Sequence, residues 1–396
     1  MVYFDLFPIF IPMKPIFRKI SVKLHLWLAL VSGIVVFIVC TTGCLYMFKD
    51  EINDATQPWR FVKPEQKEML LPTQILEIAN SVQDKQMKPS AITYQEAHDA
   101  VLVDYWDQNA GTGSIYINPY TGAVQKIKHS QPGETDFFSF VLKGHRHLWL
   151  PQKIGKPIVG YGVLMFVIIL ITGMILWWPK NWNRKSIKRL FTLKWNSSFG
   201  KINYDLHNVL GGYTFIILIL ISLTGLIWSF SWFSESVYFI SSGGEKLKAY
   251  ALPKSDVPLS DSALKDPLDR LYNQLRNEEP DAKTFYFALP SKEDDVIRVS
   301  IVHKRNSYYR TDNLFFDQYT LKPLKGEGPY AGKYKEANAA DKLRRMNLEI
   351  HDGRIMGLPG KILVFLCALI GASLPVTGIL IWLRKKRKPR SGNPKK

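Results

Sequence analysis

Five of the eight histidines lie beside the longest uncharged stretches of the sequence. These five are His25, His145, His147, His207 and His351. Ionisable side chains at membrane depth are costly and tend to mark function. Every uncharged stretch has a histidine near its entry, so we expect one pair of histidines at each face of a helix bundle. For any single histidine, the alternative is a ring lying at the membrane interface.

Paired imidazoles at these positions suggest metal chemistry. Neutral imidazole binds a metal through one ring nitrogen, and two imidazoles on facing helices can hold a haem iron from both sides. A closed zinc site fits less well, because each face lacks the third and fourth ligands. We therefore predict two six-coordinate haem groups, with His25 and His207 at one face. At the other face His351 pairs with His145 or with His147.

Four long helices must position these rings. The stretches without Asp, Glu, Lys or Arg are 24–47, 157–178, 206–234 and 362–383. Each exceeds the ~20 apolar residues that a membrane helix needs. A composition of 46% hydrophobic and 22% charged residues excludes a disordered chain. The sequence thus predicts an all-α membrane bundle of four helices with two inserted α+β domains, in contact with the lipid bilayer.

The predicted order has nine parts. They are a basic tail (1–23), a first span (24–47), a polar domain (48–144), a pre-helix segment with the second span (145–178), a basic loop (179–205), a third span (206–234), a second polar domain (235–350), a pre-helix segment with the fourth span (351–383) and a basic tail (384–396). The tails and the loop hold nineteen basic residues but only two acidic ones. Basic residues beside spans stay cytoplasmic, so both termini are predicted inside and both polar domains outside. The net charge of +18 is then explained by the orientation of the chain in the membrane and by contact with anionic lipid, so we expect no nucleic-acid partner.

The two halves of the chain repeat one pattern. Each span contains a Thr-Gly pair: Thr42-Gly43, Thr172-Gly173, Thr224-Gly225 and Thr377-Gly378. Gly43 follows His25 by 18 residues, and Gly225 follows His207 by 18 residues. Eighteen residues complete five turns and rise about 27 Å, so each glycine shares the face of its histidine at the far end of the span. We call His25 and His207 the inner pair, and His351 with His145 or His147 the outer pair. We expect both glycines at the depth of the outer pair, where the missing side chains admit the edge of a macrocycle. Ordinary small-residue packing is the alternative.

Each polar domain is predicted to be one helix followed by an antiparallel sheet. The first has a helix at 72–85 and strands near 91–95, 100–106 and 114–128, the last broken by a turn at 118–122. The second has a helix at 262–277 and strands near 283–289, 295–303 and 307–324. Its turn carries Leu321 where the first has Gly122. Four aromatic residues of these domains are candidate contacts for an electron acceptor: Tyr105, Trp106, Tyr308 and Tyr309. The alternative is that their rings pack on the faces of the strands.

Basic side chains accompany both histidine pairs. Arg146 and Arg354 flank the outer pair, and Lys23 and Lys201 lie near the inner pair. These groups can neutralise haem propionates. Anchoring at the membrane interface is the competing explanation.

Several short motifs resemble one known family, the PepSY-associated transmembrane family, whose members are often called iron-regulated membrane proteins. The motifs are Leu24-His25-x-Trp27-Leu28, Gly144-His145-Arg146, Tyr204-Asp205-Leu206-His207, His351-Asp352-Gly353-Arg354-Ile355-x-Gly357-Leu358-Pro359-Gly360 and the Trp-Trp-Pro-Lys ending at 177–180. The family includes di-haem ferric-siderophore reductases of the bacterial inner membrane. The resemblance covers nearly the whole chain and implies two haem b groups and PepSY-like domains. It favours His145 over His147.

The resemblance also implies a function. Electrons pass from a cytoplasmic donor or a membrane quinol to a periplasmic ferric siderophore, whose Fe(III) becomes Fe(II). No glycine-rich nucleotide fingerprint is present in the sequence, so the donor is expected to be separate. One alternative is a PepSY module that binds or regulates a peptidase, with the spans as anchors. Another is a siderophore transporter, although the span centres offer only Ser, Thr, Gly and Cys for a polar path.

Overall fold

The structure, a computed structural model, describes residues 15–83, 87–180, 183–257 and 264–387. The chain divides into two compact units. A helical unit is drawn from Met1–Met47, Phe138–Ser231 and Ile350–Lys396. A sheet unit is drawn from Phe48–Phe137 and Trp232–Glu349, which correspond to the two polar inserts.

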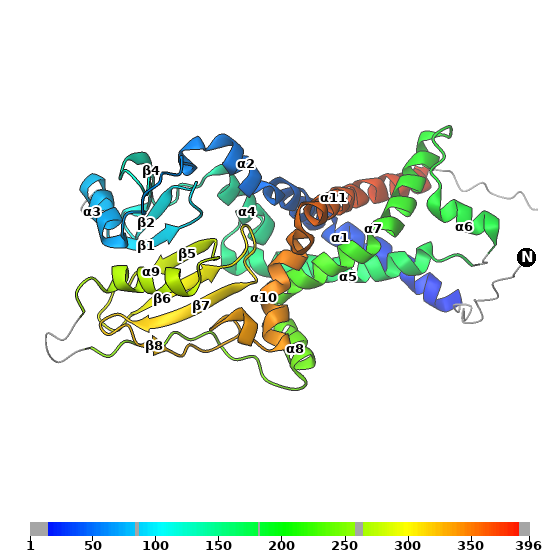
Figure 1. Cartoon of the computed structure of the whole chain (residues 1–396). Helices are drawn as coiled ribbons and strands as arrows, with labels where there is room; N and C mark the ends of the chain where they lie inside the picture. Colours follow the sequence, from blue (N-terminus) through cyan, green and yellow to red (C-terminus); the bar gives the residue numbers. More distant parts are fainter. Residues whose placement is uncertain (1–14, 84–86, 181–182, 258–263, 388–396) are drawn as a thin grey trace, which may run out of the picture. The chain divides into compact units, whose positions relative to one another are not determined.

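Four long helices form the helical unit (Figure 1). They are α1 (Pro15–Met47), α5 (Gln152–Trp177), α7 (Phe199–Ser229) and α11 (Gly357–Arg387). All four are long and apolar enough to cross a membrane, so the chain is a multi-pass membrane protein. Helix α1 packs against α5 and α11, and α7 packs against the same two. Hence α1 and α7 occupy one diagonal of the bundle, and α5 and α11 occupy the other.

Two spans differ in extent from the uncharged stretches. The described part of helix α1 begins at Pro15, nine residues before the uncharged stretch does. Helix α7 runs from Phe199 and ends at Ser229, because Phe230 adopts an extended conformation with φ −128°. The backbone then starts a separate helix. A count of uncharged residues cannot detect such a break.

Shorter helices connect or extend these elements. They are α2 (Lys49–Thr56), η1 (Pro58–Arg60), α4 (Phe137–His147), α6 (Arg184–Phe191), α8 (Ser231–Ser242), η2 (Tyr334–Glu336), α10 (Ala339–His351) and η3 (Arg354–Met356). Apolar side chains fill the centre of the bundle, with Val36, Phe166, Leu218 and Cys367 almost fully buried. Cys40, Cys44 and Cys367 are free thiols.

A single antiparallel sheet forms the sheet unit. Its strands are β1 (Pro89–Tyr94), β2 (Val101–Asp107), β3 (Gly111–Ile117), β4 (Val124–Ser130), β5 (Thr284–Ala288), β6 (Val296–Val302), β7 (Thr311–Asp317) and β8 (Pro323–Leu324). Their spatial order is β4-β3-β2-β1-β5-β6-β7-β8. Strand β1 of the first insert pairs with β5 of the second. The inserts were predicted as two domains, but they share one sheet, because joining these strands removes an unpaired edge from each half.

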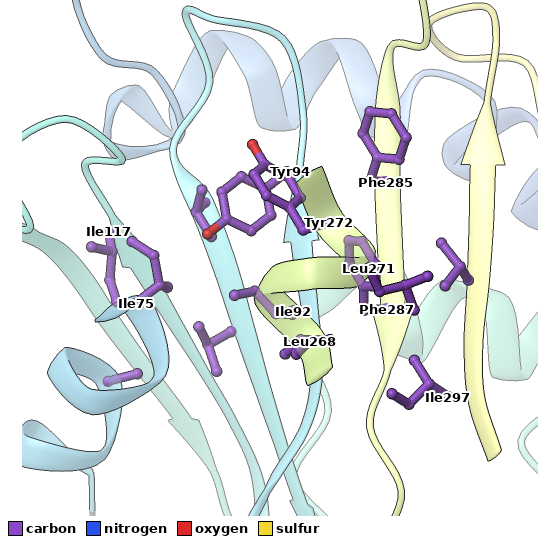
Figure 2. Close-up of a cluster of buried hydrophobic side chains, with 14 of the residues drawn as sticks. Ile75, Ile92, Tyr94, Ile117, Leu268, Leu271, Tyr272, Phe285, Phe287 and Ile297 are labelled. Carbon is purple, nitrogen blue, oxygen red and sulfur yellow. The ribbon is translucent and has the colours of Figure 1, made fainter. Parts of the chain in front are cut away.

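The two inserts also share one hydrophobic core. Helices α3 (Pro72–Val82) and α9 (Pro267–Glu278) pack on the same sheet, and Figure 2 shows Ile75 of α3 and Leu271 of α9 in one cluster of buried side chains. Strand β2 alternates buried residues such as Val103 with more exposed neighbours, as a half-buried strand must. Tyr105 belongs to this buried set, and its hydroxyl donates to Asn80 Oδ1 at 2.9 Å. Tyr105 is therefore not available on the surface to contact an electron acceptor, whereas Trp106 is 63% exposed.

The turns after β3 and β7 are built alike. Asn118 Oδ1 accepts hydrogen bonds from the backbone N–H of Tyr120 and of Thr121. Asp317 Oδ1 accepts from the corresponding Tyr319 and Thr320. The following residue is left-handed in both turns, with φ +74° at Gly122 and +57° at Leu321. Leu321 keeps this strained conformation while its side chain packs against the shared core.

Polar contacts also join the halves. Thr73 donates to the Asp269 carboxylate through both its N–H, at 2.9 Å, and its hydroxyl, at 2.5 Å. Arg305 of the second insert donates to both carboxylate oxygens of Asp99 in the first, at 2.9 and 3.3 Å. The buried Asp99 is thus held by a bidentate ion pair across the two inserts.

Candidate functional site: two histidine pairs

The first pair joins the diagonal helices α1 and α7. The ring centroids of His25 and His207 lie 6.2 Å apart, with their planes at 87°. The two residues occupy equivalent places near the starts of the two uncharged stretches. Residues from opposite halves of the chain therefore meet inside the bundle, as the sequence predicted for an inner pair.

The second pair comes from the helices that precede the other two spans. His145 in α4 and His351 at the end of α10 have ring centroids 6.1 Å apart and planes at 71°. His147 takes no part in this pair. Its Nδ1 lies 2.7 Å from the carbonyl oxygen of Leu150, within the turn that leads to α5. Of the two candidates left open by the residues, the structure brings His145 to His351.

The spacing of both pairs suits one iron between two rings. A metal–imidazole bond of about 2.0 Å, with about 1.1 Å from the nitrogen to the ring centre, places two opposed ring centres about 6 Å apart. The observed separations are 6.2 and 6.1 Å. Among the described residues, no group of three or more His, Cys, Asp or Glu could hold a bare metal ion. Two nitrogen ligands per site fit a metal whose other ligands come from a macrocycle.

Hydrogen bonds of the rings run through Nδ1. The Nδ1 atoms of His25, His145 and His351 lie 3.0, 2.9 and 2.9 Å from the carbonyl oxygens of Ile169, Val39 and Ile221. His207 Nδ1 lies 2.8 Å from the hydroxyl oxygen of Thr377, whose own proton is donated to the carbonyl of Ser373 or Leu374 in the same helix. A carbonyl accepts only from N–H, so Nδ1 carries the proton. Within the described part of the chain no hydrogen bond reaches Nε2 of these four rings, which leaves that nitrogen for a ligand role.

Glycines of the spans lie against the same rings. A Cβ atom added at Gly43 would approach His145 Cε1 to 3.2 Å, and one at Gly173 would approach His25 Cε1 to 3.1 Å. The corresponding distances are 3.5 Å from Gly225 to His351 and 3.4 Å from Gly378 to His207. Gly43 and Gly225 do lie at the level of the outer pair, as predicted. The space they leave, however, is taken by an imidazole of a neighbouring segment.

Close backbone packing places the outer histidines. A Cβ at Gly155 would lie 1.9 Å from the carbonyl oxygen of His147, so only glycine lets α4 fold back onto α5. In the second half, a Cβ at Gly360 would lie 2.1 Å from the carbonyl oxygen of Gly353. Gly353 itself has φ +75°. These two glycines thus let the turn at Gly353 pack closely against the first turn of α11.

Two of the four basic residues near the pairs are engaged in ion pairs. Arg354 forms an ion pair with Asp352 at 2.6 Å, and both side chains are largely buried. Lys201 is paired with Asp205. Arg146 and Lys23 are exposed. A role of these cations toward haem propionates stays a prediction.

Sequence reasoning missed one neighbour of the rings and one buried carboxylate. The centroid of the Trp228 ring lies 5.2 Å from that of His351, and the two rings are nearly perpendicular. Asp205 is 4% exposed, and its Oδ2 has no hydrogen-bond partner within the described residues. Neither feature follows from a residue type or spacing. The Thr-Gly repeat was visible in the sequence, but its contact with the histidines was not.

The fold and the site define a class of protein: a multi-pass membrane protein whose four-helix bundle encloses two histidine pairs and carries an α+β unit. The chain matches the family described as the PepSY-associated TM region over residues 22–385 and belongs to that family. No match was found among curated proteins.

Proposed function

We propose that this chain is a di-haem electron-transfer protein of the bacterial inner membrane that reduces a ferric siderophore outside the cytoplasm. The observation that carries the proposal is the separation of the ring centroids, 6.2 Å in one pair and 6.1 Å in the other. Ordinary interfacial histidines have no reason to meet in opposed pairs. The Nδ1 hydrogen bonds add support, because they leave Nε2 as the nitrogen of each ring that can bind a metal.

Each haem b would supply a one-electron carrier, held by His25 and His207 at one end and by His145 and His351 at the other. The chain itself orients the four histidines through the hydrogen bonds of Nδ1. Helix α1 carries His25 and, 18 residues further, Gly43 beside His145. Eighteen residues rise about 27 Å, so the two pairs lie near opposite ends of the bundle. Such a placement suits electron passage across a membrane.

The overall reaction balances as a one-electron transfer. One electron from a cytoplasmic donor or a quinol reduces siderophore-bound Fe(III) to Fe(II), and the donor is oxidised by one electron. Hard oxygen ligands hold Fe(II) less tightly, so the metal is released. A potential that is negative inside favours outward electron movement by about 2.3 kcal/mol per 100 mV for a full crossing. The basic tails and loop support the cytoplasmic orientation of both termini.

A visible spectrum of the purified protein tests the cofactor. The expected result is a set of sharp low-spin b-type bands in the reduced-minus-oxidised spectrum, with two haem groups per chain. A colourless protein that keeps its cellular function would contradict the proposal and favour the peptidase-binding module.

Reconstituted vesicles test the direction of transfer. A reductant enclosed on the cytoplasmic side should reduce an external ferric siderophore, detected with an Fe(II) chelator. His25→Ala and His351→Ala should each abolish this transfer, since either loss interrupts the path. His147→Ala is the matched control and should retain it. Vesicles that accumulate the intact siderophore instead would indicate a transporter.

A further inference from the structure

The four histidines share one kind of binding surface, repeated once in each span. The surface consists of a carbonyl group, a threonine three residues later and the glycine that follows it. The four sets are Val39, Thr42 and Gly43 for His145; Ile169, Thr172 and Gly173 for His25; Ile221, Thr224 and Gly225 for His351; and Leu374, Thr377 and Gly378 for His207. In the last set the hydrogen bond of Nδ1 is to the Thr377 hydroxyl. We call each set a seat. A seat always belongs to a different span from the one its histidine opens or precedes.

Helix geometry explains the spacing within a seat. The carbonyl of residue i accepts the N–H of residue i+4, which here is the glycine. A carbonyl oxygen has a second lone pair, and in three of the four seats the histidine Nδ1–H donates to it. The missing Cβ of the glycine lets the ring approach this carbonyl. The threonine hydroxyl donates within its own helix, as Thr172 does to Ile168 at 2.9 Å, so its oxygen can accept from Nδ1–H as well.

The four seats are of two types. At His207 and His351, the second-half rings, the threonine Oγ1 lies 2.8 and 2.9 Å from Nδ1, and an added Cβ would stay 3.4 and 3.5 Å from the ring. At His25 and His145 the hydroxyl is further away, 3.3 and 3.5 Å, while the Cβ distances shrink to 3.1 and 3.2 Å. Each pair therefore joins one ring held by a hydroxyl to one ring packed on a glycine.

We propose that the Thr-Gly seats are positioning elements with divided roles, an inference that rests on the proposed haem ligation. Thr377 and Thr224 strengthen the donor character of His207 and His351 by accepting from Nδ1–H. Gly173 and Gly43 set the rotation of the His25 and His145 rings. Hydrogen bonding at the remote nitrogen raises the basicity of a ligating imidazole. A stronger ligand stabilises the oxidised iron and lowers its midpoint potential.

Redox titration of the purified full chain tests the hydroxyl role. Thr377→Val and Thr224→Val should each shift the potential of one haem to a more positive value while haem content is kept. Thr172→Val and Thr42→Val, at the longer contacts, should give smaller shifts. Thr377→Ser restores the hydroxyl and should restore the potential. If Thr377→Val loses its haem and Thr377→Ser does not regain it, the hydroxyl is not the acting group and the inference is wrong.

Electron paramagnetic resonance of the oxidised protein tests the glycine role. The angle between two axial imidazole planes controls the anisotropy of a low-spin signal. Gly173→Ala and Gly43→Ala force their rings to turn, so each should change the signal of one haem. Gly378→Ala and Gly225→Ala are matched controls with room for the methyl group and should leave it unchanged. Wild-type potentials in Thr377→Val and Thr224→Val, together with wild-type signals in Gly173→Ala and Gly43→Ala, would overturn this inference alone. A wild-type protein without haem would overturn the proposed function.

Discussion

His145 and His351 come from different halves of the chain, yet their rings lie 6.1 Å apart in the helical unit. Each precedes a span of its own half, and each donates from Nδ1 to a carbonyl of another span, that of Val39 or Ile221. His147 lies only two positions from His145 but bonds the local carbonyl of Leu150. Two neighbouring histidines thus have different environments, and substitution can separate their roles.

His145→Ala should halve the haem content, while His147→Ala should leave it unchanged. If the proposed haem ligation is right, the first change removes one of the two histidines that would hold the outer haem and leaves the inner pair intact. The second removes only a hydrogen bond in the α4–α5 turn, worth about 1 kcal/mol. Haem and iron per chain, measured on purified protein, check this. Equal losses from both variants would show that the outer ligand had been assigned wrongly.

Much of this architecture follows from local pattern. Uncharged stretches indicate the four spans, and alternation in segments such as Val101–Asp107 indicates the strands. Equal spacing from His25 to Gly43 and from His207 to Gly225 revealed the duplication. The family resemblance was confirmed by the match over residues 22–385.

Other features depend on contacts between distant segments. The pairing of β1 with β5 joins the two inserts, but an edge strand looks the same in sequence whether its partner is a neighbour, another domain or solvent. The break at Phe230 is a backbone feature that hydropathy does not record. The contact of Gly43 with His145 likewise depends on how α1 packs beside α4.

The Asp317 carboxylate should make the sheet unit sensitive to acid. Burial raises the pKa of this carboxyl, but hydrogen bonds from Thr320, Asp256 and Tyr319 lower it. The resulting pKa is below the ordinary value. A lowered folded-state pKa gives stability that is present above the unfolded value of about 3.9 and is lost as pH falls through the folded value. Hydrogen-exchange protection of β7 should therefore fall on acidification below about pH 4.

Asp317→Asn separates this contribution from general acid effects. The amide oxygen can replace Oδ1, as Asn118 does in the first insert, but the amide nitrogen cannot accept from Asp256 N–H. We expect a loss of about 1–2 kcal/mol in local stability at neutral pH and a weaker pH dependence. Asp294→Asn, which removes an exposed ion pair with Lys254, is the control and should change little. An unaltered acid response in Asp317→Asn would refute the assignment.

Gly122→Ala should destabilise the sheet unit more than Gly332→Ala. Both glycines have nearly the same left-handed backbone, with φ +74° and +75°. An alanine at either site bears a similar backbone cost, roughly 1 kcal/mol. Only at Gly122 would the new Cβ meet a side chain, Ile78 Cδ1 at 2.7 Å, whereas Gly332 has nothing within 4 Å. The difference in hydrogen-exchange protection between the two variants measures the clash, and equal effects would show that Ile78 moves freely aside.

Arg305→Ala should destabilise the contact between the two inserts. The substitution leaves the Asp99 carboxylate, only 3% exposed, without its bidentate partner. Breaking a buried pair costs several kcal/mol, but the Arg305 side chain is 35% exposed, so we expect about 2 kcal/mol. Exchange protection should fall in β1 and β5 together, because these strands join the halves. Arg310→Ala, which removes a bond to Tyr309 on the surface, is the control. Loss confined to the second insert would mean that the ion pair does not couple them.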